Sequence, residues 1–415
     1  MAIDAETRTL FTDEFMMNPY PEIARLRAEE PVHWVPELGC WFVTRHDDVK
    51  RLLNDPDIAT PDRRAWEGHV PPEPGSYLAW VTDNSILALS GAEHARVRRL
   101  VSKAFTPKAI ARMEDQIREV VARFAAPLAG RTGVVDLMGE YTEPIPNTVI
   151  SRITGIPAID GDERRFRELA QALIGAAIPF ASPEEQAAAE PALLELSAWV
   201  RRLAGERAAE PRDDLISDLV QAHDMGDTMT ADEIVLLVTA LISAGSETTA
   251  LGGMVALLTL LLMPDVLERV RADRSLLPQA VNEVLRHTMG GPGGLQRYAV
   301  RDVELRGAQV RAGQMLLLSF GGANRDPEAF DDPDLFDIDR DHSNLLSFGH
   351  GPHYCLGVHL ARTELRCMVD AALDVIPPGA ELRLEQLQLR PFGMFSRPVN
   401  LPVDFGPAPA PAPMG

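Results

Sequence analysis

The sequence predicts a mainly α-helical protein with a small β part, on the strength of three observations. Its 415 residues are 46% hydrophobic and 24% charged, which is enough apolar material for a large buried core. Long segments repeat apolar residues at helical spacing, whereas the runs that alternate like strands are few and short. No Gly/Ser-rich linker or break in composition divides the chain, so we expect a single domain over residues 1–405.

Apolar residues recur at helical spacing in five long segments, namely residues 113–126, 191–203, 230–262, 277–287 and 355–373. The third segment has a clear start, because Thr230 precedes Glu233 by three residues, which is the spacing of a capping box. Its middle contains Gly245 among several Ser and Thr residues, which are poor helix formers. We therefore expect a local widening of the helix there.

Strand-like patterns occur at residues 33–44, 299–305 and 315–320. The turn-forming pairs Arg306-Gly307 and Ala312-Gly313 separate the last two. These short runs account for the small β part of the prediction. At the C-terminus, residues 406–415 are rich in Pro and Ala, and we expect them to form a disordered tail.

Charge and cysteine content argue against several classes of protein. The formal net charge of −21 opposes binding to nucleic acid or to an anionic membrane surface. Three cysteines in a long chain speak against a disulfide framework and for the cytoplasm, and the N-terminus lacks the pattern of a secretory signal peptide. Residues 234–263 are apolar enough to span a membrane, but Glu247 at their centre favours a helix buried in a soluble domain.

The densest group of reactive side chains lies near the start of the last predicted helix. Taken by themselves, His350, His353, Cys355 and His359 could bind zinc, or Cys355 could be an ordinary buried cysteine. A glycine-rich turn that enters a helix also supplies N–H donors and a positive helix end, and both stabilise a thiolate. The residue types alone leave these interpretations open.

The spacing of Phe348, Gly351, Cys355 and Gly357 resembles the haem-binding signature F-x-x-G-x-x-x-C-x-G of the cytochrome P450 family. Further similarities in the expected order extend this resemblance over nearly the whole chain. It implies the cytochrome P450 fold, with haem b between the long central helix and the loop of the Cys ligand. It also implies that Cys355 is the axial ligand of the haem iron and that Phe348, Gly349 and Gly357 belong to the haem-binding loop.

A second similarity lies in the central helix, where Ala244-Gly245-x-Glu247-Thr248-Thr249 resembles the oxygen-activation motif of the family. The resemblance implies that Thr248 donates a hydrogen bond to bound O2 and that Glu247 supplies protons to it. A simpler interpretation of the residues alone is that the threonine hydroxyls bond to the preceding helical turn.

A third similarity concerns the two haem propionates, which need cationic hydrogen-bond donors if they are buried. The resemblance implies that these donors are His94, Arg98, Arg297 and His353. Each of them, considered alone, is also typical of a solvated surface cation.

A fourth similarity is Glu283-x-x-Arg286, whose spacing allows an ion pair on one face of a helix. In the family this pair is buried and shapes the thiolate side of the haem, usually with an arginine as third partner. That arginine is missing from residues 333–336, so we expect Arg340 or Arg325 to replace it.

Residues 287–297 contain four glycines and, in the family, line the distal pocket. We expect a wide, apolar pocket that accepts a bulky molecule such as a steroid or terpenoid. The alternative is that the glycines only permit an unusual backbone turn. The residues expected near the substrate are Leu241, Ala244, Gly293, Leu295 and Phe395.

The resemblance implies a monomeric monooxygenase that uses O2 to hydroxylate this substrate. Electrons must come from a separate ferredoxin and its reductase, because no G-x-G-x-x-G motif follows a predicted strand. Arg362 and Arg366 are expected to face that partner on the thiolate side. One alternative is a peroxide-driven peroxygenase, against which Glu247 and Thr248 argue. The other is a zinc- or haem-binding sensor without turnover.

Overall fold

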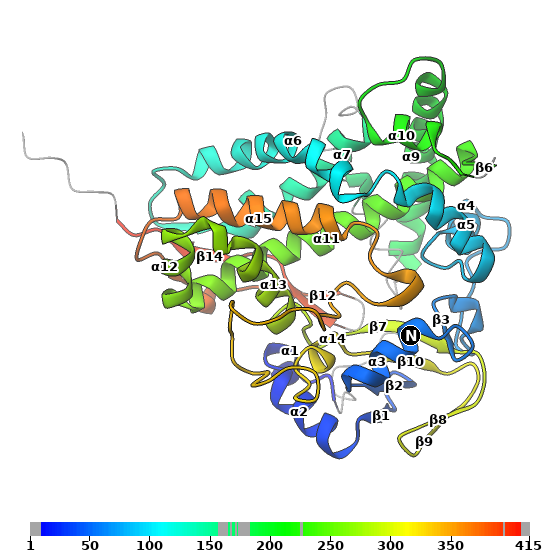
Figure 1. Ribbon diagram of the computed structural model, residues 1–415, viewed down its shortest axis with the longest axis horizontal. Coiled ribbons are helices and arrows are strands. Elements are labelled where there is room, and N and C mark those ends of the chain that lie inside the picture. The colour runs from blue at the N-terminus through cyan, green and yellow to red at the C-terminus, as the bar shows by residue number, and fades with distance from the viewer. Residues whose placement is uncertain are drawn as a thin grey trace, which may run out of the picture.

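The structure is a computed structural model that describes residues 10–156, 165–166, 168–170, 172, 183–224, 227–392 and 395–407. Figure 1 shows a body of long helices, with most of the strands gathered below it. The predicted mainly α fold with a small β part is therefore confirmed.

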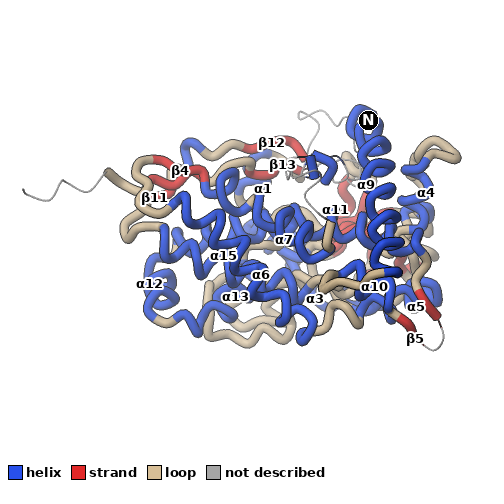
Figure 2. Tube along the Cα trace, turned by 90° about the horizontal axis from the view of Figure 1, so that it is seen from above, coloured by secondary structure: helices blue, strands red, loops and turns tan. Residues whose placement is uncertain are grey.

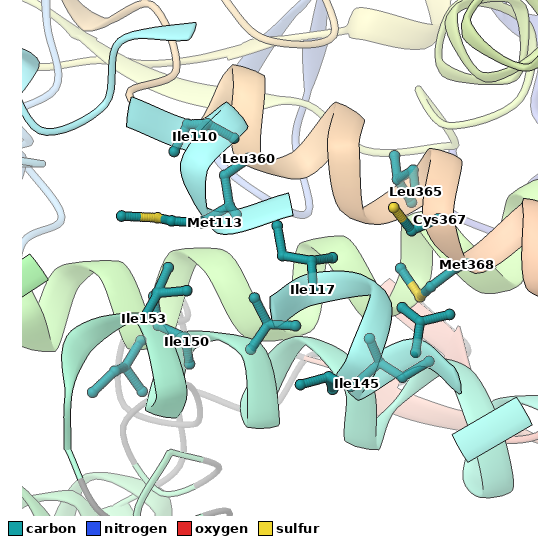
Figure 3. Packing of buried hydrophobic residues seen from close by; sticks show 14 of the residues in the cluster. Ile110, Met113, Ile117, Ile145, Ile150, Ile153, Leu360, Leu365, Cys367 and Met368 are labelled. Atoms are coloured by element: carbon teal, nitrogen blue, oxygen red, sulfur yellow. The ribbon is translucent and has the colours of Figure 1, made fainter. Parts of the chain in front are cut away.

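Four helices form the centre of the main hydrophobic core: α6 (Pro107–Ala125), α7 (Pro144–Thr154), α11 (Ala231–Leu262) and α15 (Val358–Val375). Figure 3 shows how the apolar side chains of α6, α7 and α15 meet. Each fully buried Leu, Ile or Met side chain stabilises the fold by about 1.5–3 kcal/mol relative to an exposed one. Helices α11 and α15 approach closely because Gly252 and Gly253 lack a Cβ, which would come within 3.1 Å of Leu365 and Met368.

The central helix α11 is 32 residues long and begins as the sequence predicts. The hydroxyl of Thr230 accepts a hydrogen bond from the backbone N–H of Glu233, whose carboxylate accepts one from the N–H of Thr230 at 2.8 Å. The predicted widening near Gly245 is wrong, because α11 stays α-helical throughout. The one described π-helical turn, η4, lies at Met138–Thr142 instead.

Further helices whose bounds the structure describes surround this core. They are α1 (Asp13–Met17), α2 (Tyr20–Glu29), α3 (His46–Asn54), α4 (Tyr77–Asn84), α5 (Gly91–Ser102), α9 (Pro183–Ala209), α10 (Leu215–Gln221), α12 (Pro264–Ala272), α13 (Leu277–His287) and α14 (Phe320–Ala323). Short 3-10 turns are η2 (Arg63–Ala65), η3 (Ala126–Leu128), η5 (Arg274–Leu276), η6 (Gly351–His353) and η7 (Leu384–Gln386). The predicted helices at residues 191–203 and 277–287 are confirmed as parts of α9 and α13.

The largest sheet has five strands in the order β1-β2-β10-β7-β3, and only the β2–β10 pair is parallel. Its strands are β1 (Val32–Val35), β2 (Cys40–Val43), β3 (Ala59–Thr60), β7 (Leu295–Ala299) and β10 (Met315–Leu318). A three-stranded sheet contains β4 (Val134–Asp136), β11 (Glu381–Leu382) and β14 (Pro402–Asp404). Two-stranded hairpins join β5 (His223–Asp224) to β6 (Asp227–Thr228), β8 (Val303–Leu305) to β9 (Ala308–Val310), and β12 (Leu389–Phe392) to β13 (Phe395–Pro398).

The strand predictions are confirmed in part. Residues 33–44 form the β1–β2 hairpin, and residues 315–318 form β10. The predicted strand at residues 299–305 is confirmed at residues 303–305, which form β8, and is wrong at residues 300–302, which lie between the end of β7 at Ala299 and the start of β8. Between β8 and β9, Arg306 and Gly307 have φ angles of 48° and 86°, as a tight hairpin turn requires.

Helix α11 is, among the described residues, the one helix whose length and hydropathy would allow it to cross a membrane. Of its most apolar window, 61% is buried inside the protein, which is typical of a core helix. Figure 2 shows α11 lying among other helices. Most of the predicted C-terminal tail, residues 408–415, lies outside the described residues.

Candidate functional site

Cys355 lies in a tight loop between η6 and α15. Its backbone N–H donates a hydrogen bond to the carbonyl of Phe348 at 2.9 Å, which closes the loop. Gly349 and Gly351 have φ angles of 73° and 72°, and a Cβ on Gly351 would come within 2.7 Å of the Asn54 side chain. Helix α15 begins at residue 358, so the predicted helical start at residue 355 is wrong by three residues. The thiol therefore precedes the positive end of the helix.

Two opposing effects act on the ionisation of Cys355. Burial raises the pKa of the thiol above its usual range. The backbone N–H of Gly357 and the positive charges of Arg98 and Arg362 lower it. These three groups favour the thiolate, which is the form that binds a metal. Arg362 is itself held over the ring of Phe348, with 4.9 Å between its guanidinium carbon and the ring centroid.

The zinc interpretation of this histidine-rich segment is wrong for the part of the chain that the structure describes. No three His, Cys, Asp or Glu side chains come together there in a way that could hold a metal ion. His353 instead lies against His94, in a tilted pair with 3.9 Å between the ring centroids.

The four predicted propionate donors come together from three distant segments. His94 and Arg98 lie on α5, Arg297 lies on β7, and His353 lies in η6. Burial, followed by the charges of His94, Arg297 and Arg98, lowers the pKa of His353 to about 3. Arg98 also donates a hydrogen bond to the carbonyl of Tyr354 at 2.6 Å, one residue before Cys355.

None of these four side chains forms an ion pair with Asp or Glu within the described residues. Arg297 is 4% exposed and its pKa is lowered to about 10 by burial, yet within the described part of the chain its guanidinium donates one hydrogen bond, to the carbonyl of Gln296 at 2.8 Å. Buried cations are costly unless an anion accompanies them. The cluster is therefore chemically suited to a ligand with carboxylate groups, as the two propionates of haem provide.

One face of α11 is accessible although its neighbours are buried. Ala244 and Thr248, one turn apart, are exposed, while Ile242, Ser246 and Thr249 are buried. The Thr248 hydroxyl donates a hydrogen bond to the carbonyl of Ala244 at 2.5 Å. The hydroxyl proton of Thr248 therefore bonds to the preceding helical turn, as the simpler interpretation of the sequence predicts. Its oxygen keeps lone pairs that can accept a proton or a hydrogen bond.

The glycines after α13 have backbone functions that weaken the argument for a wide pocket. A Cβ on Gly290 would come within 2.4 Å of the backbone of Gly321, and one on Gly294 within 2.4 Å of the Leu318 carbonyl. Gly291 has a φ of 53°, which favours glycine. The alternative interpretation, in which the glycines are needed by the backbone and not by a substrate, therefore accounts for three of the four.

For the other predicted substrate residues, the structure describes the exposure of some but not of all. Leu241 is half-buried on α11, close in sequence to Ala244. Gly293 is also partly accessible, and Leu295 is 37% exposed at the start of β7. Phe395 belongs to β13, but its side chain lies outside what the structure describes.

Glu283 and Arg286 form a fully buried, two-pronged ion pair on α13, with contacts of 2.7 and 2.8 Å. The remaining N–H groups of Arg286 donate to the carbonyls of Asn324, Pro333 and Leu335 at 2.7–3.0 Å. The arginine thus fastens the segment that precedes the Cys355 loop to α13.

The third partner of this pair was not identified from the sequence. It is His342, whose Nε2 lies 3.0 Å from the Glu283 carboxylate. Arg340 contributes only an ion-pair contact at 3.7 Å, and Arg325 instead donates to the carbonyl of His287 at 2.7 Å. His342 was visible only as one of several histidines near Cys355, and nothing in its spacing links it to Glu283.

The two arginines predicted to face an electron donor differ in their surroundings. Arg366 forms an ion pair with Glu114 at 2.8 Å, which offsets its charge. Arg362 contacts the Phe348 ring and lies near Cys355. Neither side chain is fully buried.

Comparison with known proteins agrees with this geometry. Residues 200–374 match the family model "Cytochrome P450". The chain is 36% identical to cytochrome P450 monooxygenase PikC of Streptomyces venezuelae over 88% of this chain and 85% of that protein. It is 33% identical to vitamin D(3) 25-hydroxylase of Pseudonocardia autotrophica over 97% of both.

Among solved structures, that of epothilone D-bound cytochrome P450epoK aligns with a TM-score of 0.85 and 31% identity, covering 96% of this chain and 99% of that one. The chain therefore belongs to the cytochrome P450 family of haem-thiolate monooxygenases, and its cofactor is haem b.

Proposed function

We propose that this P450 monooxygenase hydroxylates a bulky, apolar small molecule of the steroid or terpenoid kind. It would use O2 and electrons from a separate ferredoxin and ferredoxin reductase. The observation that carries this proposal is the accessible face of α11, where small apolar Ala244 lies one turn from the hydroxyl of Thr248. An apolar group can approach a proton-carrying side chain there without burying an unpaired polar atom.

In this proposal Cys355 is the axial ligand, and Phe348, Gly349 and Gly357 shape its loop. His94, Arg98, Arg297 and His353 bind the propionates, which supply the anion that the buried guanidinium of Arg297 lacks, while the two imidazoles offer neutral N–H donors. When bound, the haem binds O2 and carries out the oxidation. The protein contributes the thiolate, the orientation of the substrate and the supply of protons.

Proton supply is assigned to Glu247 and Thr248. Oxygen cleavage with release of water would consume two protons, which the protein must deliver to the site. Thr248 can accept a proton on its oxygen and donate its own from the same atom, while Glu247 is the neighbouring group that can exchange protons with solvent. A peroxide-driven enzyme would not need this pair, so its presence favours the O2-dependent reaction.

The bulky, apolar character proposed for the substrate is supported by the relatives. Vitamin D(3) and epothilone D, which appear in their names, are both large molecules with extensive apolar surface. Leu241, Ala244, Gly293, Leu295 and Phe395 are the proposed contacts. The proposal also includes a single domain over residues 1–405, a monomer, and a cytoplasmic location.

Substrate-induced changes in the haem absorbance test this proposal. A panel containing steroids, terpenoids and linear fatty acids would be titrated into the wild-type protein. We expect a steroid or terpenoid to produce the spectral shift and to yield a hydroxylated product with O2, ferredoxin, reductase and NADPH. Exclusive binding of a linear fatty acid, or turnover with hydrogen peroxide alone, would contradict it.

A further inference from the structure

Asn324 is a fully buried residue at the end of α14 that the proposed reaction does not use. Its side-chain oxygen accepts a hydrogen bond from the backbone N–H of Leu346 at 2.8 Å. Its side-chain nitrogen donates to the hydroxyl of Ser347 at 2.7 Å. Its backbone carbonyl accepts from Arg286 at 2.9 Å. A single side chain thus connects α14 to the segment that leads into the Cys355 loop.

The direction of these hydrogen bonds is fixed by one group. A backbone N–H can only donate, so the amide atom that faces Leu346 must be the oxygen. The nitrogen then faces Ser347, whose hydroxyl oxygen accepts. The proton of that hydroxyl is left to donate to the carbonyl of Leu285, and the structure places this contact at 2.6 Å.

This chain of hydrogen bonds completes the end of α13. The last four carbonyls of a helix have no partner within the helix, and Leu285 is in the last turn of α13. Ser347 satisfies its carbonyl, while Arg286, the next residue, donates to Asn324. Residues 285–286, 324 and 346–347 therefore form a closed ring that involves three separate segments.

The ring ends where the Cys355 loop begins. The N–H of Gly349 donates to the carbonyl of Leu346 at 2.7 Å, and the N–H of Cys355 donates to the carbonyl of Phe348 at 2.9 Å. A shift of Leu346 or Ser347 would therefore move Phe348 and, with it, the backbone that positions the sulfur.

We propose that Asn324 is a positioning residue for Cys355: through Leu346 and Ser347 it fixes the loop against α13, so that the sulfur stays in place as the iron ligand. This inference rests on the proposed role of Cys355. It assigns a function to the side-chain amide that neither a carboxylate nor an apolar group of similar size can fulfil, because both a donor and an acceptor are needed.

The test uses two independent changes in the haem-loaded protein. Asn324→Asp keeps the size of the side chain but replaces its N–H donor with an acceptor and adds a charge in a fully buried position. Ser347→Ala removes the hydroxyl, and Ser347→Thr restores it. Asn344→Asp is the matched control, because Asn344 is exposed and lies two residues before Leu346.

The measurement is the ratio of the red-shifted to the blue-shifted Soret band of the reduced carbon monoxide complex in mild urea, where circular dichroism shows that the fold is intact. For Asn324→Asp and Ser347→Ala we expect this ratio to fall by at least about tenfold, because the first variant loses the hydrogen bond from Asn324 to Ser347 and the second loses that bond and the one to Leu285. Ser347→Thr and Asn344→Asp should keep the wild-type ratio.

Wild-type ratios in both Asn324→Asp and Ser347→Ala would overturn the inference. If Asn324→Asp does not accumulate as folded protein, the comparison of Ser347→Ala with Ser347→Thr decides alone, and equal ratios would overturn it. Absence of a red-shifted band from the wild type and from Asn344→Asp would instead refute the proposed role of Cys355.

Discussion

Replacing Glu283 with Gln should destabilise the protein strongly, although the change preserves the size of the side chain. Burial opposes the charged form of Glu283, but hydrogen bonds from Arg286, His342 and the backbone of Asp337 outweigh it and lower the pKa to about 2. Compared with its ordinary value of 4.5, this shift corresponds to about 3 kcal/mol of folding free energy. Breaking a buried ion pair typically costs about 3–5 kcal/mol, in agreement.

The pH dependence of this contribution has a definite sign. The folded-state pKa of Glu283 lies below the unfolded-state value, so its stabilising effect is complete above about pH 4.5 and is lost as the pH falls towards 2. The difference in stability between wild type and Glu283→Gln should therefore be largest at neutral pH. This difference in the free energy of unfolding should become smaller as the pH falls from about 4.5 towards 2.

Urea unfolding followed by circular dichroism, at about pH 7 and about pH 3, measures both effects. Glu29→Gln is the control, because Glu29 is 63% exposed and its pair with Arg25 at 2.6 Å lies on the surface. This control should change the free energy of unfolding too little to measure. A loss below about 1 kcal/mol in Glu283→Gln, or the same loss at both pH values, would refute the reasoning.

Three further outcomes are expected. Thr248→Val should lower product formation per NADPH consumed by about 100-fold, since the proton relay is lost, and peroxide release should rise; unchanged coupling would contradict the relay. Arg297→Met should accelerate haem transfer to apomyoglobin by about 10- to 100-fold, because a propionate loses its hydrogen-bond donor. The control Arg301→Met, at an exposed position, should not change the rate. Equal transfer rates for the two variants would show that Arg297 does not bind a propionate. Gly290→Ala should lower the urea midpoint because its Cβ would overlap the α14 backbone, whereas Gly205→Ala, with open space around its Cβ, should leave it unchanged or raise it.

Local patterns identified the helices well. The apolar periodicity of residues 277–287 predicted α13 with its observed bounds, because that helix buries one face and exposes the other. Thr230 and Glu233 located the start of α11, since a capping box is formed within four residues. Where the signal is contained in neighbouring residues, the sequence was sufficient.

Features that depend on distant segments could not be predicted in this way. His342 meets Glu283 across 59 positions, and no spacing rule links them. The glycine at position 290 is required by Gly321, which belongs to another element. The boundary between β7 and β8 was missed because Ala299, Val303 and Leu305 keep to alternate positions on either side of the bend, where Val300 is 42% exposed.

In the candidate site, too, local features could be predicted from the sequence and features that depend on distant segments could not. Cys355 could be singled out because its loop signature is local. The four predicted propionate donors, His353 and the three residues around it, become a cluster only when α5, β7 and η6 are brought together. Considered one at a time, each was equally consistent with an ordinary surface residue, and only the absence of acidic partners among the described residues distinguishes the set.

The central claim is that Cys355 is the thiolate ligand of the haem. The most direct test is the absorbance spectrum of the reduced protein under carbon monoxide, compared for wild type, Cys355→Ala and the control Cys367→Ala, in which a buried free cysteine is removed. We predict a strongly red-shifted Soret band in wild type and Cys367→Ala that is missing from Cys355→Ala. Persistence of the band in Cys355→Ala, or a wild-type protein without it, would contradict the account.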